Sequence, residues 1–147
     1  MNGQYRIKLL SKITTAIAGD ISQLMKKHQP NTANLSISAL KKIVANPLTH
    51  ILVAIDKKNN VIGMITIVSY LTLHNTYKTW FEDLFVDESV RRQGIGQALI
   101  KQAMSLAKKL KIKVVNFTSR PCRIAANQLY KKLGFKLYQT NHYKYKL

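Results

Sequence analysis

Residues 82–100, EDLFVDESVRRQGIGQALI, join an apolar strand to an amphipathic helix through a glycine turn. Gly94 and Gly96 lack side chains, so the backbone of this turn can adopt unusual conformations and approach a ligand closely. The free amides of the first helical turn face outward at the positive end of the helix dipole, which suits a pyrophosphate. Arg91 and Arg92 add positive charge at the same place. The pattern predicts a phosphate-binding turn; a solvated basic loop before an ordinary helix is the alternative.

Two familiar nucleotide motifs do not fit this turn. A P-loop ends in Gly-Lys-Ser/Thr, which the chain lacks. A Rossmann turn follows its strand directly and has a third small residue where Leu99 stands, whereas residues 87–93 intervene here. Neither nucleotide fold is therefore expected.

The flanking segments predict a single mixed α/β domain over residues 1–147, with elements in the order β-α-α-β-β-β-α-β-α-β-β. Gly63 indicates a bulge, Ser38 is the expected cap of the second helix, and Gly134 is the expected left-handed end of the last helix. The strand–helix–strand unit from Thr79 to Thr118 implies parallel pairing, so helices should flank a partly parallel central sheet. The expected strands are 5–9, 51–56, 61–70, 79–86 and 114–118, the expected helices are 14–27, 38–46, 95–110 and 123–133, and a final hairpin pairs 135–138 with 143–147.

Composition limits the class of protein. The 147 residues include 24 Lys and Arg against 6 Asp and Glu, a net charge of +18, and 46% are hydrophobic. This length and apolar content suit one folded domain and exclude a disordered basic tail. One cysteine excludes a disulfide framework, and four scattered histidines lack metal-ligand spacing, so no metal is expected. Because neither a signal peptide nor a membrane span is predicted, we expect a cytoplasmic protein that does not bind membranes.

The positive charge favours an anionic partner. The lysines are spread along the whole chain and no nucleic-acid fold signature is present, so nucleic acid is not the expected partner. The acids are more informative, because four of the six lie within residues 82–88. This segment is therefore the first place to look for acid–base chemistry.

The C-terminal half resembles the GNAT superfamily of acetyl-CoA-dependent N-acetyltransferases. The resemblance covers residues 80–86 with the Arg-x-x-Gly-x-Gly turn at 91–96, then residues 118–121, then residues 125–135, in the right order and spacing. It implies a GNAT-like fold and transfer of an acetyl group from acetyl-CoA directly to an amine of a small molecule or a protein. A non-catalytic protein of this fold that binds nucleic acid or another partner is the alternative, and a homodimer stays open.

The resemblance also implies where acetyl-CoA binds. The pantetheine arm should pair with backbone groups at the end of the strand, where one amide faces the thioester carbonyl, and the amides of 92–97 should hold the pyrophosphate. Asn127 would hydrogen-bond the pantetheine amides, with an ordinary helix-surface asparagine as the alternative. The expected cofactor residues are Leu84, Phe85, Val86, Arg91, Arg92, Gln93, Gly94, Ile95, Gly96, Gln97, Asn127 and Tyr130.

Tyr130 is the expected catalytic acid. Its phenol, with an ordinary pKa of about 10, lies near enough to that of a thiol to protonate a departing thiolate. On its helix it shares a polar stripe with Asn127, beside a core stripe formed by Ala125, Leu129 and Leu133. An amphipathic tyrosine at a helix edge is the alternative.

Glu82 is the expected base, acting directly or through water. An ammonium acceptor must lose a proton before it attacks, and a carboxylate at a desolvated strand centre can accept that proton. The resemblance also implies that Glu82 and Asp83 contribute to the acceptor site. Since side chains alternate along a strand, the two should point to opposite faces. An ion pair with a lysine is the alternative for Glu82, whereas Asp87 and Glu88 are expected to be solvated or ion-paired loop acids.

Overall fold

The computed structural model describes residues 5–31 and 35–147. The chain forms two compact units, residues 1–117 and residues 118–147. The first unit contains the sheet and three α-helices, and the second contains one α-helix.

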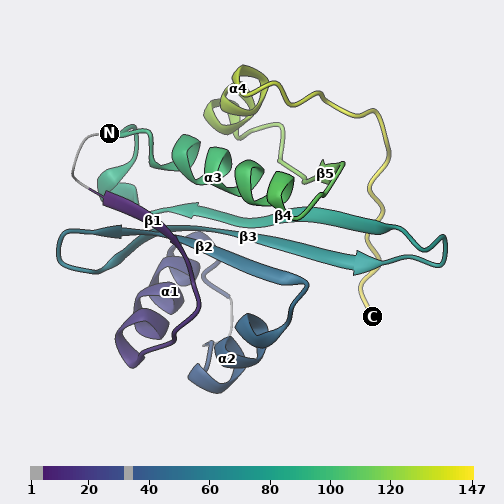
Figure 1. Cartoon of the computed structure of the whole chain (residues 1–147). Helices are drawn as coiled ribbons and strands as arrows, with labels where there is room; N and C mark the ends of the chain where they lie inside the picture. The colour runs from purple at the N-terminus through teal and green to yellow at the C-terminus, as the bar shows by residue number, and fades with distance from the viewer. Residues whose placement is uncertain (1–4, 32–34) are drawn as a thin grey trace. The chain divides into compact units, whose positions relative to one another are not determined.

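The first unit is built on a five-stranded sheet whose strands lie in sequence order (Figure 1). The first three pairs are antiparallel and the last is parallel, as the strand–helix–strand pattern predicts. The helix of that crossover spans Ile95–Lys109, one residue shorter than the predicted 95–110. The strands are β1 (Tyr5–Leu9), β2 (Thr49–Asp56), β3 (Val61–Leu71), β4 (Tyr77–Val86) and β5 (Val115–Asn116).

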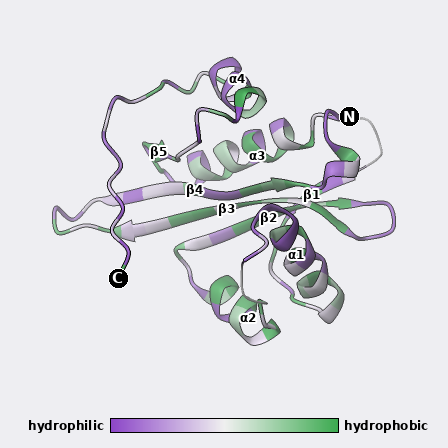
Figure 2. Ribbon diagram, turned by 180° about the vertical axis from the view of Figure 1, so that it is seen from behind, coloured by the Kyte–Doolittle hydropathy of each residue, from purple (hydrophilic) through white to green (hydrophobic). Residues whose placement is uncertain are grey.

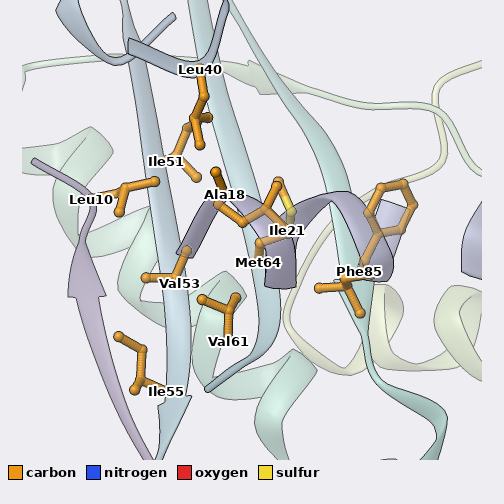
Figure 3. Packing of buried hydrophobic residues seen from close by; sticks show 11 residues of the cluster. Leu10, Ala18, Ile21, Leu40, Ile51, Val53, Ile55, Val61, Met64 and Phe85 are labelled. Carbon is orange, nitrogen blue, oxygen red and sulfur yellow. The ribbon is translucent and has the colours of Figure 1, made fainter. Parts of the chain in front are cut away.

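Helices cover both faces of this sheet, α1 (Thr15–His28) and α2 (Ile37–Ala45) on one and α3 (Ile95–Lys109) on the other (Figure 1). The central strands β2 and β3 are predominantly hydrophobic along their length, as Figure 2 shows, because both of their faces are covered. On the α1 side, Ile21 packs with Val53, Met64 and Phe85 in the main apolar cluster (Figure 3). No helix among the described residues is long and apolar enough to cross a bilayer.

Gly63 lies where α3 packs closely against the sheet. The register between β2 and β3 shifts beside it, as expected for a bulge. A Cβ at this position would meet the carbonyl oxygen of Phe85 at 3.1 Å, Leu99 Cδ1 at 3.2 Å and Ile95 Cγ2 at 3.3 Å. The missing side chain therefore lets the start of α3 lie directly against β3 and β4.

Several expected boundaries are wrong. Ser36, not Ser38, caps α2, and its hydroxyl accepts the amide of Ala39 at 3.1 Å. The fifth strand has only two residues instead of five. Residues 135–147 form no strand, so the predicted closing hairpin is absent; two short strands with exposed side chains cannot bury enough apolar surface to be stable as an isolated ribbon.

The second unit contains α4 (Ile124–Lys132), which ends with Gly134 at φ +86°, as predicted. Its expected core stripe is only partly correct. Leu129 and Leu133 are half-buried, but Ala125 is exposed.

Candidate functional site

The edge of β4 beyond Trp80 is open on the side of β5. The register pairs β5 only with Thr79 and Trp80. Within the described part of the first unit, no strand therefore pairs with residues 81–86 on this side. An unpaired strand edge presents backbone N–H and C=O groups that an extended ligand can use.

A bulge interrupts the same stretch of β4. Glu82 pairs with Thr66 and Phe85 with Met64, so two residues, Asp83 and Leu84, lie opposite one residue of β3. Asp83 has φ +50°, a left-handed conformation that is uncommon for residues other than glycine. The ladder is locally disrupted, which frees backbone groups beside the open edge. The sequence analysis did not predict this bulge.

The glycine turn has the geometry of an anion site. Gly94 caps α3 at φ +79°, with no side-chain hydrogen bond to the first helical turn, and Arg92 is also left-handed at φ +63°. A Cβ on Gly94 would meet nothing within 4 Å. A Cβ on Gly96 would make only an ordinary contact, 3.7 Å from Val86 Cγ2. The absence of a side chain at Gly96 is therefore not required by packing and leaves the backbone open to a ligand.

The acids before the turn are ion-paired. Lys27 Nζ lies 2.6 Å from Asp87 Oδ2, and Arg91 Nη1 lies 3.0 Å from Glu88 Oε1. The hydrogen bond from Lys27, followed by those from Ser89, lowers the pKa of Asp87 to about 2. Asp87 therefore stays charged at any pH at which the protein would be assayed. Asp87 and Glu88 were expected to be solvated or ion-paired, and the structure shows them ion-paired.

Thr66 of β3 is associated with both Glu82 and Asp83. Thr66 is the register partner of Glu82 and donates a side-chain hydrogen bond to Asp83. The bulge interrupts the regular alternation on which the prediction of opposite faces rests. Burial, and then the negative charge of Asp83, raise the pKa of Glu82. Burial also raises the pKa of Asp83, opposed by the Thr66 hydrogen bond. A carboxylate with a raised pKa is a better proton acceptor.

The second unit holds the other two expected residues. Burial raises the pKa of Tyr130, opposed by the positive charge of Arg123, so the phenol keeps its proton. Its ring lies edge-on to that of Phe135, with the ring centroids 6.3 Å apart. Asn127 Nδ2 donates to the carbonyl oxygen of Arg120 at 2.9 Å and closes the turn before α4. A contact of Asn127 with pantetheine would therefore come from Oδ1.

Two residues that were not among the predicted site residues contact the end of β4 and the residue after it: His28 contacts Val86, and Lys27 contacts Asp87. His28 Nε2 lies 3.2 Å from the carbonyl oxygen of Val86. Because the two segments are about sixty residues apart, no local spacing could have indicated this contact. Within the described residues no group of three or more His, Cys, Asp or Glu could hold a metal ion.

Comparison with known proteins extends these observations. Residues 21–135 match the model of the acetyltransferase (GNAT) family. No curated protein sequence matches the chain.

Several solved structures similar to this chain are acetyltransferases. One is an aminoglycoside acetyltransferase from an uncultured soil metagenomic sample, in complex with trehalose (TM-score 0.83, 18% identity, covering 99% of this chain and 98% of that chain). Another is the aminoglycoside N-acetyltransferase AAC(6')-Iy in complex with CoA (TM-score 0.81, 15% identity, 99% and 97%). A third is glucosamine-6-phosphate N-acetyltransferase from Arabidopsis thaliana (TM-score 0.76, 14% identity, 95% and 98%). At these identities the likeness shows a shared fold.

Proposed function

The chain belongs to the GNAT acetyltransferase family, and on that premise we propose which of its residues carry out the reaction. It is an acetyl-CoA-dependent N-acetyltransferase, whose acceptor is an amine. The assignment of individual residues rests on one observation above all. The open, bulged end of β4 is followed, after residues 87–93, by a helix N-terminus with two glycines and no side-chain cap.

The residues at this place fit acetyl-CoA. An extended pantetheine arm needs backbone donors and acceptors, which the edge at Leu84, Phe85 and Val86 offers. A pyrophosphate needs amides and positive charge, which residues 91–97 offer at the start of α3. Gly96 leaves room for close approach because the protein itself does not fill the space. We assign the pantetheine to the first segment and the pyrophosphate to the second.

The chemistry needs a base and an acid from the chain. Acetyl-CoA supplies an acetyl thioester, whose sulfur leaves as a thiolate. Glu82, with its raised pKa, accepts a proton from the acceptor ammonium directly or through water. Asp83 helps to hold the acceptor beside it. Tyr130, which burial keeps protonated, holds the proton that the departing sulfur requires.

We also propose that residues 1–147 act as one GNAT-like domain. The family match runs from residue 21 to residue 135 and so includes most of the first unit and the α4 segment of the second. The assignment of Tyr130 as the acid depends on this arrangement.

The acceptor is proposed to be an anionic amine. The structural neighbours are named for aminoglycosides, which carry several positive charges, and for an amino-sugar phosphate. This chain has a net charge of +18, and Asp87 and Glu88 are already ion-paired. A positive field raises the local concentration of anions and lowers that of polycations. Glucosamine 6-phosphate is therefore a better first test than an aminoglycoside.

Calorimetric titration with CoA tests the cofactor site, and a thiol-release assay with a panel of amines tests the reaction. We expect wild type to bind CoA at micromolar to millimolar concentration. Gly96→Ala should fold as wild type does but bind CoA about tenfold more weakly, equivalent to ~1.4 kcal/mol, because its methyl group occupies the approach. Gly19→Ala, in the middle of α1 with nothing within 4 Å of the added Cβ, is the matched control and should bind CoA normally. If wild type binds no CoA, the proposal is wrong.

A further inference from the structure

The end of α1 contacts residues 85–87, which lie at the end of β4 and before the glycine turn. Lys27 Nζ lies 2.6 Å from Asp87 Oδ2, and the His28 ring stacks on Phe85 with centroids 4.6 Å apart and planes 9° from parallel. His28 Nε2 lies 3.2 Å from the carbonyl oxygen of Val86. Since a carbonyl oxygen only accepts, His28 Nε2 carries the hydrogen of this bond. Two consecutive residues of α1 thus hold three consecutive residues, 85–87.

Asp87 also hydrogen-bonds to the segment that precedes the glycine turn. While Oδ2 binds Lys27, Oδ1 accepts the amide of Ser89 at 3.0 Å and its hydroxyl at 2.7 Å. These bonds start the short 3-10 helix η1 (Glu88–Val90), and Arg91, which pairs with Glu88, follows it. Asp87 also donates its own amide to the carbonyl oxygen of Ile62 at 2.9 Å. Asp87 therefore connects α1 to Ser89 through its carboxylate and connects to β3 through its backbone amide, just before the expected phosphate site.

We propose that Lys27 and His28 are positioning residues for acetyl-CoA binding. They hold the glycine turn in position through their contacts with Asp87 and Val86. The inference rests on the proposed function, because the turn must hold the cofactor for its position to matter. A turn held in the binding conformation loses less conformational freedom when the ligand binds. Loss of the contacts that Lys27 and His28 make with residues 85–87 should therefore weaken binding of the cofactor without slowing the chemical step.

The test compares Lys27→Met with Lys26→Met by calorimetric titration of CoA and by steady-state kinetics. Both residues are exposed and both changes remove one positive charge from the last turn of α1, so any general effect of charge on CoA is common to both. Lys27→Met should raise the Kd for CoA and the KM for acetyl-CoA about three- to fivefold, as for a partly exposed ion pair, with kcat unchanged. Lys26→Met should match wild type, and Lys27→Arg should restore binding.

Two further variants separate positioning from simple support of the fold. His28→Phe keeps a ring for the stack on Phe85 but loses the hydrogen bond to Val86, and should raise the Kd about threefold. In an Asp87→Asn background, Lys27→Met should have no additional effect, because the contact between Lys27 and Asp87 is already lost. If both Lys27→Met and His28→Phe bind CoA as Lys26→Met does, the positioning role is wrong. If wild type itself binds no CoA, the proposed function fails before this inference is reached.

Discussion

At the scale of single residues, the two neighbouring carboxylates of β4 are distinguished by their surroundings. Glu82 is exposed, yet its pKa is raised, first by partial burial and then by the charge of Asp83. Asp83 is held at φ +50° by the bulge, with Thr66 hydrogen-bonded to it. In the proposed mechanism Glu82 exchanges a proton with an incoming amine, while Asp83, hydrogen-bonded to Thr66, raises the pKa of Glu82 through its charge.

The pH dependence of the reaction should reveal this division. The base is active when deprotonated, so kcat/KM falls as the pH drops through the raised pKa of Glu82. Asp83→Asn removes the like charge, lowers the pKa of Glu82 and should move the acid limb to lower pH. Asparagine tolerates the left-handed conformation at this position. Glu82→Gln should abolish the limb and lower kcat about 10²-fold.

The control for this experiment is Glu88→Gln, which removes a negative charge outside β4. It pairs with Arg91, so it can alter the KM for acetyl-CoA, but the acid limb should stay where it is in wild type. An acid limb that is identical in wild type and Asp83→Asn would remove Asp83 from any electrostatic role, and one that persists in Glu82→Gln would assign the base elsewhere.

Tyr130 should contribute to catalysis through its hydroxyl group and not through its ring. Tyr130→Phe keeps the edge-on contact with Phe135 but has no proton to donate. We expect kcat to fall about 10²- to 10³-fold, as for loss of a general acid, with an unchanged Kd for CoA in calorimetry. Tyr138→Phe is the matched control, because that residue is 84% exposed in the same unit. Equal turnover of the two variants would exclude Tyr130 as the acid.

At the scale of elements, the contact between α3 and the sheet depends on one missing side chain. Gly63→Ala would place a Cβ 3.1 Å from the backbone oxygen of Phe85 and close to Leu99 and Ile95. The backbone of β4 cannot easily move, so α3 would have to shift. We expect a loss of ~1–3 kcal/mol in the free energy of unfolding, the usual cost of overpacking, measured by urea denaturation.

Gly19 provides the opposite case in the same unit. It lies inside α1 with open space around it, so Gly19→Ala should raise the free energy of unfolding by ~0.5–1 kcal/mol through helix propensity alone. If Gly63→Ala were as stable as Gly19→Ala, the close packing of α3 on β3 would not be a constraint on this fold.

The elements that could be predicted from the sequence are those with local signals. The 3.6-residue period of α3 and the apolar arms of β2 and β3 were sufficient, and Gly134 was placed correctly because a left-handed helix end depends on the residue itself. The bulge at Asp83 could not be predicted, because a left-handed aspartate is imposed by pairing with β3. Two serines two residues apart, Ser36 and Ser38, are equally good caps, and packing chooses between them.

For the whole molecule, the difference between local signals and contacts of distant segments also applies to the proposed cofactor site and to the residues that position it. The glycine turn is continuous in sequence and could be recognised, whereas the tie from Lys27 to Asp87 joins segments sixty residues apart. A hydrogen bond such as that between Lys27 and Asp87 depends on the topology: α1 packs against the sheet that contains β4, and β4 is followed by the glycine turn. The predicted C-terminal hairpin failed for the converse reason: residues 135–147 have the alternating pattern of strands, but pattern alone does not supply a surface on which to bury one face.

The net charge makes a prediction about acceptors that belongs to the molecule as a whole. Four of the six acids are engaged locally: Asp87 and Glu88 pair with cations, and Asp20 and Asp56 accept backbone amides. Most of the 24 basic side chains therefore have no acidic counterpart to neutralise them. Such a field acts over roughly one Debye length, ~8 Å at physiological ionic strength, and is screened by added salt.

We therefore expect kcat/KM for an anionic amine acceptor to exceed that for the same amine without its phosphate, and to fall as salt is raised from 50 to about 500 mM. A polycationic amine should show the opposite salt response, because screening relieves its repulsion. Measuring both acceptors at saturating acetyl-CoA separates this effect from the salt dependence of cofactor binding. If the polycation is the better acceptor and loses activity with salt, the local carboxylates of Glu82 and Asp83 outweigh the global field, and the acceptor site is cationic in its specificity.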